Sequence, residues 1–139
     1  MLATALKSIL RELNASSPDI EASACISNDG INIAAVLGKD INADRYSAMC
    51  ASLLALANRA AQEIQHGDLK LLLVEGKQGV MLLVQAGENS ILAVAAKPSQ
   101  NLGMIFMTAK KFAKQIIDTL EQFSSKNKSL TTMQQLQIA

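Results

Sequence analysis

Aromatic residues are scarce in this sequence of 139 residues, which has no tryptophan, one tyrosine and three phenylalanines. Half of the residues are hydrophobic, so the core must be built from leucine, isoleucine, valine, alanine and methionine. Nucleic-acid-binding surfaces combine a basic field with aromatic rings that stack on bases. The formal net charge is only +1. We therefore expect no nucleic acid among the partners.

Cysteine and histidine, the residues of many reactive and metal sites, are also few. Cys25 and Cys50 stand outside any CxxC or CxxH spacing, so neither a zinc site nor a disulfide framework is predicted. We interpret both as reduced, buried residues of a cytoplasmic protein. His66 precedes Gly67 at a predicted helix end, where the helix dipole accounts for it.

Motifs of nucleotide binding and covalent catalysis are missing as well. The segment GKQG at residues 76–79 lacks the upstream glycine and the following Ser or Thr of a phosphate loop. No GxSxG nucleophile motif occurs. The sequence therefore predicts that the protein is not an enzyme and has no catalytic residues, bound metal or cofactor.

Long hydrophobic runs are absent too. The longest uncharged stretch, residues 46–58, has 13 residues, whereas a helix needs about 20 to cross a bilayer. The N-terminal segment carries Lys7, Arg11 and Glu12 and does not have the pattern of a signal peptide. We expect no membrane insertion and a cytoplasmic location.

What is present is a regular alternation of helix-type and strand-type hydrophobic patterns. Apolar spacing of three and four residues predicts helices over 2–13, 43–65 and 102–123. Runs of alternating or continuous apolar residues predict strands over 20–27, 31–36, 69–75, 80–86 and 90–96. The order αββαβββα predicts an α+β fold, a five-stranded antiparallel sheet with helices on both faces. We assign residues 1–123 to a single domain and 124–139 to a flexible C-terminal tail.

The first two strands are joined by Asn28, Asp29 and Gly30. A carboxylate beside a glycine suits a metal loop, a phosphate loop or a simple bend. Asp29 has no companion ligands and no helix follows Gly30, so we interpret Asp29 and Gly30 as the central pair of a tight hairpin. We also predict that the first strand buries one face, through Ile20, Ala22, Ala24 and Ile26.

The hydrophobic and glycine patterns resemble those of the roadblock family, named for a dynein light chain, over about residues 2–123. The resemblance rests on "ISNDGINIAAVL" at 26–37 and "QEIQHGDLKLLLVEGKQGVMLLVQAGENSILAVAAK" at 62–97, and on "NLGMIFMTAKKFAKQIIDTL" at 101–120. It implies a profilin/roadblock-like fold. It also implies the function of bacterial and archaeal members, which act as regulators of Ras-like GTPases.

The resemblance further implies a homodimer, or a heterodimer with another roadblock protein. In the family the long second helix packs on its counterpart and the third strand pairs with its counterpart. Small residues in this helix would allow close approach, and its bulky residues would fill the seam. The predicted dimer interface comprises Ala48, Met49, Ser52, Leu53, Leu56, Leu71 and Leu73. The simpler alternative is a monomer that buries this helix internally.

We therefore expect a non-enzymatic, dimeric regulator or scaffold that binds a Ras-like small GTPase. Basic residues exceed acidic ones after residue 96, and the face formed by Lys110, Lys111 and Lys114 is a candidate contact for an acidic partner, although such a face is also typical of a solvated helix. One alternative is a small-molecule sensor of PAS-like architecture, which needs a cavity with polar groups. Another is a purely structural dimerisation adaptor.

Overall fold

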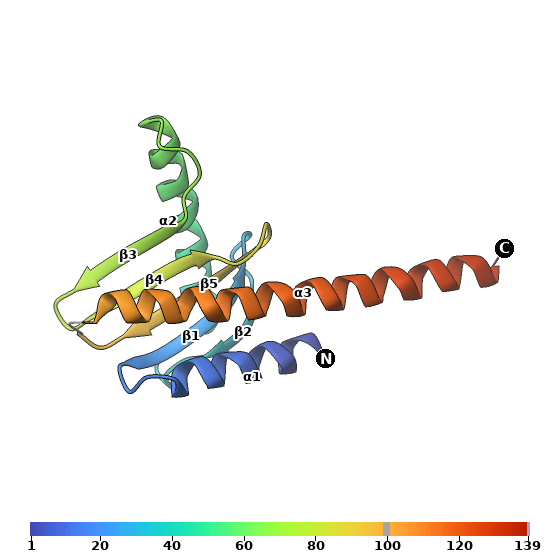
Figure 1. Cartoon of the computed structure of the whole chain (residues 1–139), viewed down its shortest axis with the longest axis horizontal. Coiled ribbons are helices and arrows are strands. Elements are labelled where there is room, and N and C mark those ends of the chain that lie inside the picture. Colours follow the sequence, from blue (N-terminus) through green and yellow to red (C-terminus); the bar gives the residue numbers. More distant parts are fainter. Residues whose placement is uncertain (99–100, 139) are drawn as a thin grey trace.

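The computed structural model describes residues 1–98 and 101–138, with side chains described for 1–98 and 101–126. The elements follow the predicted order (Figure 1). They are α1 (Leu2–Ala15), β1 (Ile20–Ser27), β2 (Asn32–Val36), α2 (Ala43–Glu63), β3 (Leu71–Gly76), β4 (Gly79–Gln85), β5 (Ser90–Ala96) and α3 (Leu102–Ile138). The α+β class and the order αββαβββα are therefore confirmed.

The five strands form one antiparallel sheet in the order β2-β1-β5-β4-β3. Strands β2 and β3 are its two edges, and α2 carries the chain from one edge to the other. Asn42 begins α2, and its side chain accepts a hydrogen bond from the Arg45 backbone N–H at 3.0 Å.

Helices cover both faces of the sheet, and each face has its own hydrophobic core. Helices α1 and α3 lie side by side on one face, where Leu6, Leu10 and Leu13 pack with Phe112 and Ile116. On the other face α2 packs over β1 and β2. The core on this side is smaller and is formed by Ala24, Ile26, Cys50, Ala51, Leu54, Leu83, Ile91 and Ala93.

Strand β1 is buried on both faces, which corrects the prediction of one buried face. It lies between β2 and β5 and is covered from both sides. Cys25 faces the α1 and α3 core, whereas Ala24 and Ile26 face α2. The Ser23 hydroxyl donates to Asn14 Oδ1 at 2.7 Å, which links β1 to α1. Ser23 and Cys25 are small enough to be buried, so their alternation with apolar residues did not mark a solvent face.

The turn after β1 is longer than the predicted two-residue hairpin. The Gly30 N–H donates to the Ser27 carbonyl at 2.9 Å, and Gly30 has a φ of 87°. Asp29 is not among the residues with positive φ, so the turn is of the three-residue kind in which one glycine takes the left-handed conformation. As a result β2 begins at Asn32, and Ile31, predicted in the strand, is exposed.

Three helix ends differ from the sequence-based bounds. Helix α1 ends at Ala15 and not at residue 13. Helix α2 ends at Glu63, and the chain leaves it through Gln65 and Gly67, which have φ values of 62° and 81°. Helix α3 continues to Ile138, beyond residue 123 where we expected its end. The side chains of residues 127–139 lie outside the described part, and the division into a domain and a flexible tail stays a prediction.

Candidate functional site

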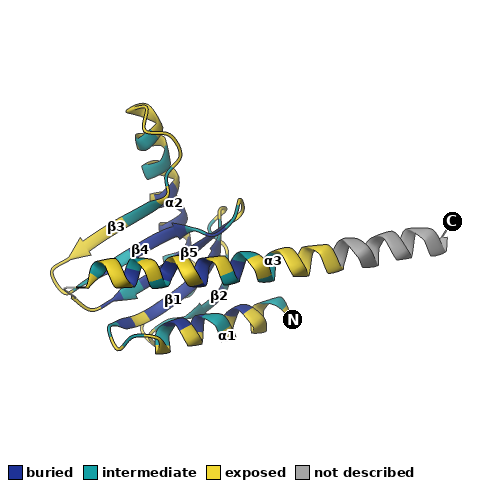
Figure 2. Ribbon diagram, viewed as in Figure 1, coloured by how far each residue is buried: buried dark blue, intermediate teal, exposed yellow. Residues whose placement is uncertain are grey.

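Helix α2 presents an apolar stripe to solvent on the side opposite to the sheet. Ser47, Cys50, Ala51 and Leu54 face inward and are buried. The exposed fractions of Met49, Leu53 and Leu56 are 53%, 40% and 65%. Ala48 and Ser52 are also exposed. These are the five α2 residues of the predicted interface, and all of them are exposed, although Ala48 also lies close to Gly30 of the turn after β1. Figure 2 shows that the far end of α2 and most of β3 are exposed.

The second part of this surface is the edge strand β3. It pairs only with β4, so its other edge is open among the described residues. The strand is apolar yet largely exposed, with Leu73 at 44% and Val74 at 39%. An open apolar edge is a template for pairing with another strand.

The side chains of β3 divide between the two sheet faces, which the predicted interface did not anticipate. Leu71 and Leu73 pair with Val84 and Leu82, which belong to the core beneath α1 and α3. Leu71 is partly buried there. Leu72 and Val74 therefore lie on the α2 side, because successive strand residues alternate between faces. The alternation could have been used on the sequence to separate Leu71 and Leu73 from Leu72 and Val74. Because the run LLLV is apolar throughout, however, it does not indicate which pair lies on the α2 face of the sheet.

A tyrosine, a thiol and a thioether meet between α2 and β4. The Tyr46 hydroxyl donates to the Met81 sulfur at 2.9 Å, and Cys50 lies one helical turn from Tyr46. Burial raises the pKa of the Tyr46 hydroxyl far above its ordinary value, and burial likewise raises the pKa of the Cys50 thiol. Both groups stay protonated at neutral pH, so this cluster stabilises packing and does not supply a nucleophile.

The predicted basic contact lies elsewhere. Lys110, Lys111 and Lys114 are exposed on α3, across the sheet from α2. The Lys110 ammonium lies 4.7 Å from the ring centroid of Phe106, and the Lys111 ammonium 6.0 Å from that of Phe112. The structure therefore presents two separate surfaces, an apolar one on α2 and β3 and a basic one on α3.

The part of the chain that the structure describes contains no candidate metal-binding site. No group of three or more histidine, cysteine and acidic side chains there is arranged to hold an ion. Asp29 and His66 are exposed. Within the described residues no helix combines the length and the apolar character needed to cross a membrane.

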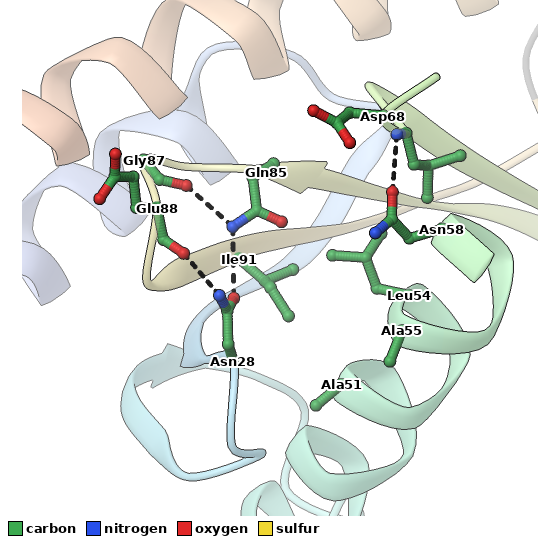
Figure 3. A pocket seen from close by; sticks show the side chains of 11 residues that line it. Asn28, Ala51, Leu54, Ala55, Asn58, Asp68, Gln85, Gly87, Glu88 and Ile91 are labelled. Atoms are coloured by element: carbon green, nitrogen blue, oxygen red, sulfur yellow. Dashed lines mark hydrogen bonds between the residues drawn. The ribbon is translucent and has the colours of Figure 1, made fainter. Parts of the chain in front are cut away.

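A cavity of about 500 Å³ opens beside α2 and was not predicted (Figure 3). Its walls come from α2, the loop after it, the β1–β2 turn and the end of the β4–β5 hairpin. No sequence motif could have revealed this site, because its polar residues come from four segments that are distant in the sequence.

Comparison with known proteins identifies the family. The Roadblock/LC7 domain matches residues 6–96. The uncharacterized protein MJ1340 of Methanocaldococcus jannaschii is 37% identical over 108 residues, covering 78% of this chain and 93% of that protein. MJ0714 of the same organism is 33% identical over 116 residues, covering 84% and 97%.

Solved structures share the fold. A Roadblock/LC7 domain from Streptomyces avermitilis has a TM-score of 0.77 at 20% identity, covering 83% of this chain and 97% of that one. MglB of Myxococcus xanthus has a TM-score of 0.79 at 16% identity, covering 86% and 90%. Because the family match spans well over half of the sequence, the chain belongs to the Roadblock/LC7 domain family.

Proposed function

We propose that this protein is a non-enzymatic, cytoplasmic, dimeric regulator or scaffold that binds a Ras-like small GTPase. The observation that carries the proposal is the apolar surface formed by the outer stripe of α2 and the open edge of β3. Two features, the exposed apolar side chains of α2 and the open edge of β3, support a protein interface over a solvated face.

Dimerisation accounts for the apolar surface most directly. Pairing of β3 with its counterpart would satisfy the open backbone edge, and Met49, Leu53 and Leu56 would be removed from water at the same time. Ala48 and Ser52 are small and would let two α2 helices approach closely. An interface of about 1,600 Å² in total is usual for a stable complex.

GTPase binding is inferred from the family. The arginines Arg11, Arg45 and Arg59 all lie on helices, the first on α1 and the other two on α2. Because none projects from a loop, we do not assign this chain an arginine finger supplied to the partner. Regulation would instead act by selecting one conformation of the switch loops of the GTPase.

A pull-down would test the proposal with a Ras-like GTPase of the same organism, prepared either locked with GTP or loaded with GDP. We expect one nucleotide state to be retained preferentially. Equal retention of both states would support a scaffold that docks the GTPase without selecting a state. Absence of both, with a dimer still present, would favour the purely structural dimerisation adaptor and contradict the GTPase part of the proposal.

A further inference from the structure

The cavity beside α2 is built by a network of amide side chains. Gln85 Nε2 donates to the Gly87 carbonyl at 2.8 Å and to the Ser90 carbonyl at 3.1 Å, and Asn28 Nδ2 donates to the Glu88 carbonyl at 2.6 Å. Gln85 Nε2 also lies 3.3 Å from Asn28 Oδ1. A backbone carbonyl can be contacted only by the NH₂ end of an amide, so these bonds fix the orientation of both side chains.

The loop after α2 closes the other end of the cavity. Asn58 Oδ1 accepts from the Leu69 backbone N–H at 2.8 Å, which ties this loop to the helix. Asp68 lies just before Leu69 and is exposed, and its carboxylate accepts only a long bond of 3.3 Å from Gln62 among the hydrogen bonds described. Figure 3 shows Asp68 and Asn58 together at this end, across from Glu88 and Gly87.

The charged residues that line the cavity, Asp68 and Glu88, are both acidic. The Gln85 NH₂ group and one N–H of Asn28 are used within the network, which leaves the Gln85 oxygen, on the α2 side in Figure 3, and the carboxylate of Asp68 as acceptors, whereas the Glu88 carboxylate points away from the cavity in this view. Asn58 adds two N–H donors and Asn28 adds one. No lysine, arginine or histidine is among the described residues that line the cavity. A cationic group that brings its own donors therefore complements the Asp68 carboxylate and the Gln85 oxygen.

The floor of the cavity is apolar. It is formed by Ala51, Leu54 and Ala55 of α2 together with Leu69 and Ile91. Such a floor suits a short methylene stem, which lysine and arginine side chains carry beneath their charged heads. An isolated inorganic cation would leave this floor unused.

The bulkiest residues of the outer stripe are turned away from the cavity. Met49 and Leu56 of the stripe lie about 200° around the helix from Ala51 and Leu54 of the cavity. Ala48 of the predicted interface and Ala55 of the cavity are seven residues apart and share one side of α2, so the cavity borders the proposed dimer surface.

We propose that this cavity binds a guanidinium or ammonium group carried on a short apolar stem, with Asp68 and the Gln85 oxygen receiving the cationic head. The same chemistry is found in a free amine or guanidine and in a basic side chain of a protein partner. The site does not depend on GTPase binding, so its failure would leave the proposed function untouched.

An NMR titration of the full-length protein tests the chemistry. The probe is N-butylguanidinium, and N-butylurea is its neutral analogue. For so small a probe we expect a dissociation constant in the millimolar range. We expect the cation to shift backbone amide signals of Asp68, Gly87 and Glu88 and the urea to bind at least about tenfold more weakly.

Two variants and a control locate the site. Asp68→Asn should weaken binding of the cation about tenfold without changing that of the urea. Ala55→Phe should fill the exposed side of the cavity and abolish binding of both probes. Glu121→Gln removes an exposed carboxylate of α3 and should have no effect. Circular dichroism should show that all three variants stay folded.

A second pair of probes distinguishes the source of the cation. Acetyl-Gly-Arg-Gly-amide is compared with the same peptide carrying neutral citrulline in place of arginine. Tighter binding of the arginine peptide than of N-butylguanidinium would identify a protein side chain as the ligand, and equal or weaker binding would identify a free small molecule. Equal binding of the cation and the urea, or an unchanged affinity in Asp68→Asn, would overturn the proposal.

Discussion

At the scale of single residues, Gly30 combines two constraints that are usually found apart. Its φ of 87° lies in the left-handed region, and a Cβ placed on it would lie 3.1 Å from the backbone Cα of Ala48 in α2. The turn that follows β1 therefore also sets how closely α2 packs on the sheet. Gly67 has a similar φ of 81°, but a Cβ placed on it would meet no described atom within 4 Å.

Comparison of Gly30→Ala with Gly67→Ala separates these constraints. Both variants lose about 1 kcal/mol of unfolding free energy to backbone strain. Gly30→Ala should lose about 1–2 kcal/mol more, because α2 must shift away from the new methyl group. Urea denaturation followed by circular dichroism measures both values. Equal losses would show that contact with Ala48 does not constrain the turn.

The thiol of Cys25 makes stability depend on pH. Burial raises its pKa from 9.0 to about 11. The unfolded chain therefore ionises this thiol first as the pH rises, so its contribution to stability is complete below about pH 9 and is lost progressively toward pH 11.

Relative to Cys25→Ala, the wild type should lose about 2 kcal/mol of unfolding free energy between pH 9 and pH 11. The cavity left by the substitution lowers stability at every pH and so cancels in this comparison. Urea denaturation at several pH values measures the difference. Parallel pH profiles for the two proteins would contradict the assigned burial effect.

At the scale of elements, the sequence was informative where a pattern has one physical cause. Asn42 precedes the apolar spacing of α2, and its capping bond is present. Burial of both faces of β1 could not be predicted, because Ser23 and Cys25 are compatible with a core and with a surface. The sheet face on which Leu71 and Leu73 lie could not be predicted, because the run around them is apolar throughout. The cavity depends on Asn28, Asp68 and Gln85, which only the folded chain brings together.

The outer stripe of α2 gives the sharpest prediction at this scale. Leu53→Glu should yield a monomer, because a carboxylate in an apolar seam remains unpaired on dimerisation. The fold should persist, since Leu53 is 40% exposed in the single chain. Met107→Glu on α3, at a position 68% exposed, is the matched control and should stay dimeric.

Size-exclusion chromatography with light scattering measures the molar mass of each protein, which is compared with the 14.8 kDa of a monomer. A wild-type monomer at all concentrations would contradict the dimer itself. If the Leu53→Glu variant stays dimeric, the interface must lie outside this stripe.

At the scale of the whole molecule, the sheet separates two surfaces that can act independently. The α2 stripe lies on one face of the sheet, and the exposed lysines of α3 lie on the other. If the second surface contacts an acidic region of the GTPase, its contribution is electrostatic. Such a contribution changes association rate and salt dependence more than the assembly of the dimer.

The combined variant Lys110→Glu, Lys111→Glu and Lys114→Glu tests this separation. We expect it to remain a dimer, because these residues lie on the opposite face from the α2 stripe. The GTPase should associate with it at least about tenfold more slowly at low salt, and the difference should shrink as salt screens the charges. Stopped-flow association at several salt concentrations measures both effects. Unchanged rates would assign the lysines to a solvated helix face, and partner binding would then have to use another surface.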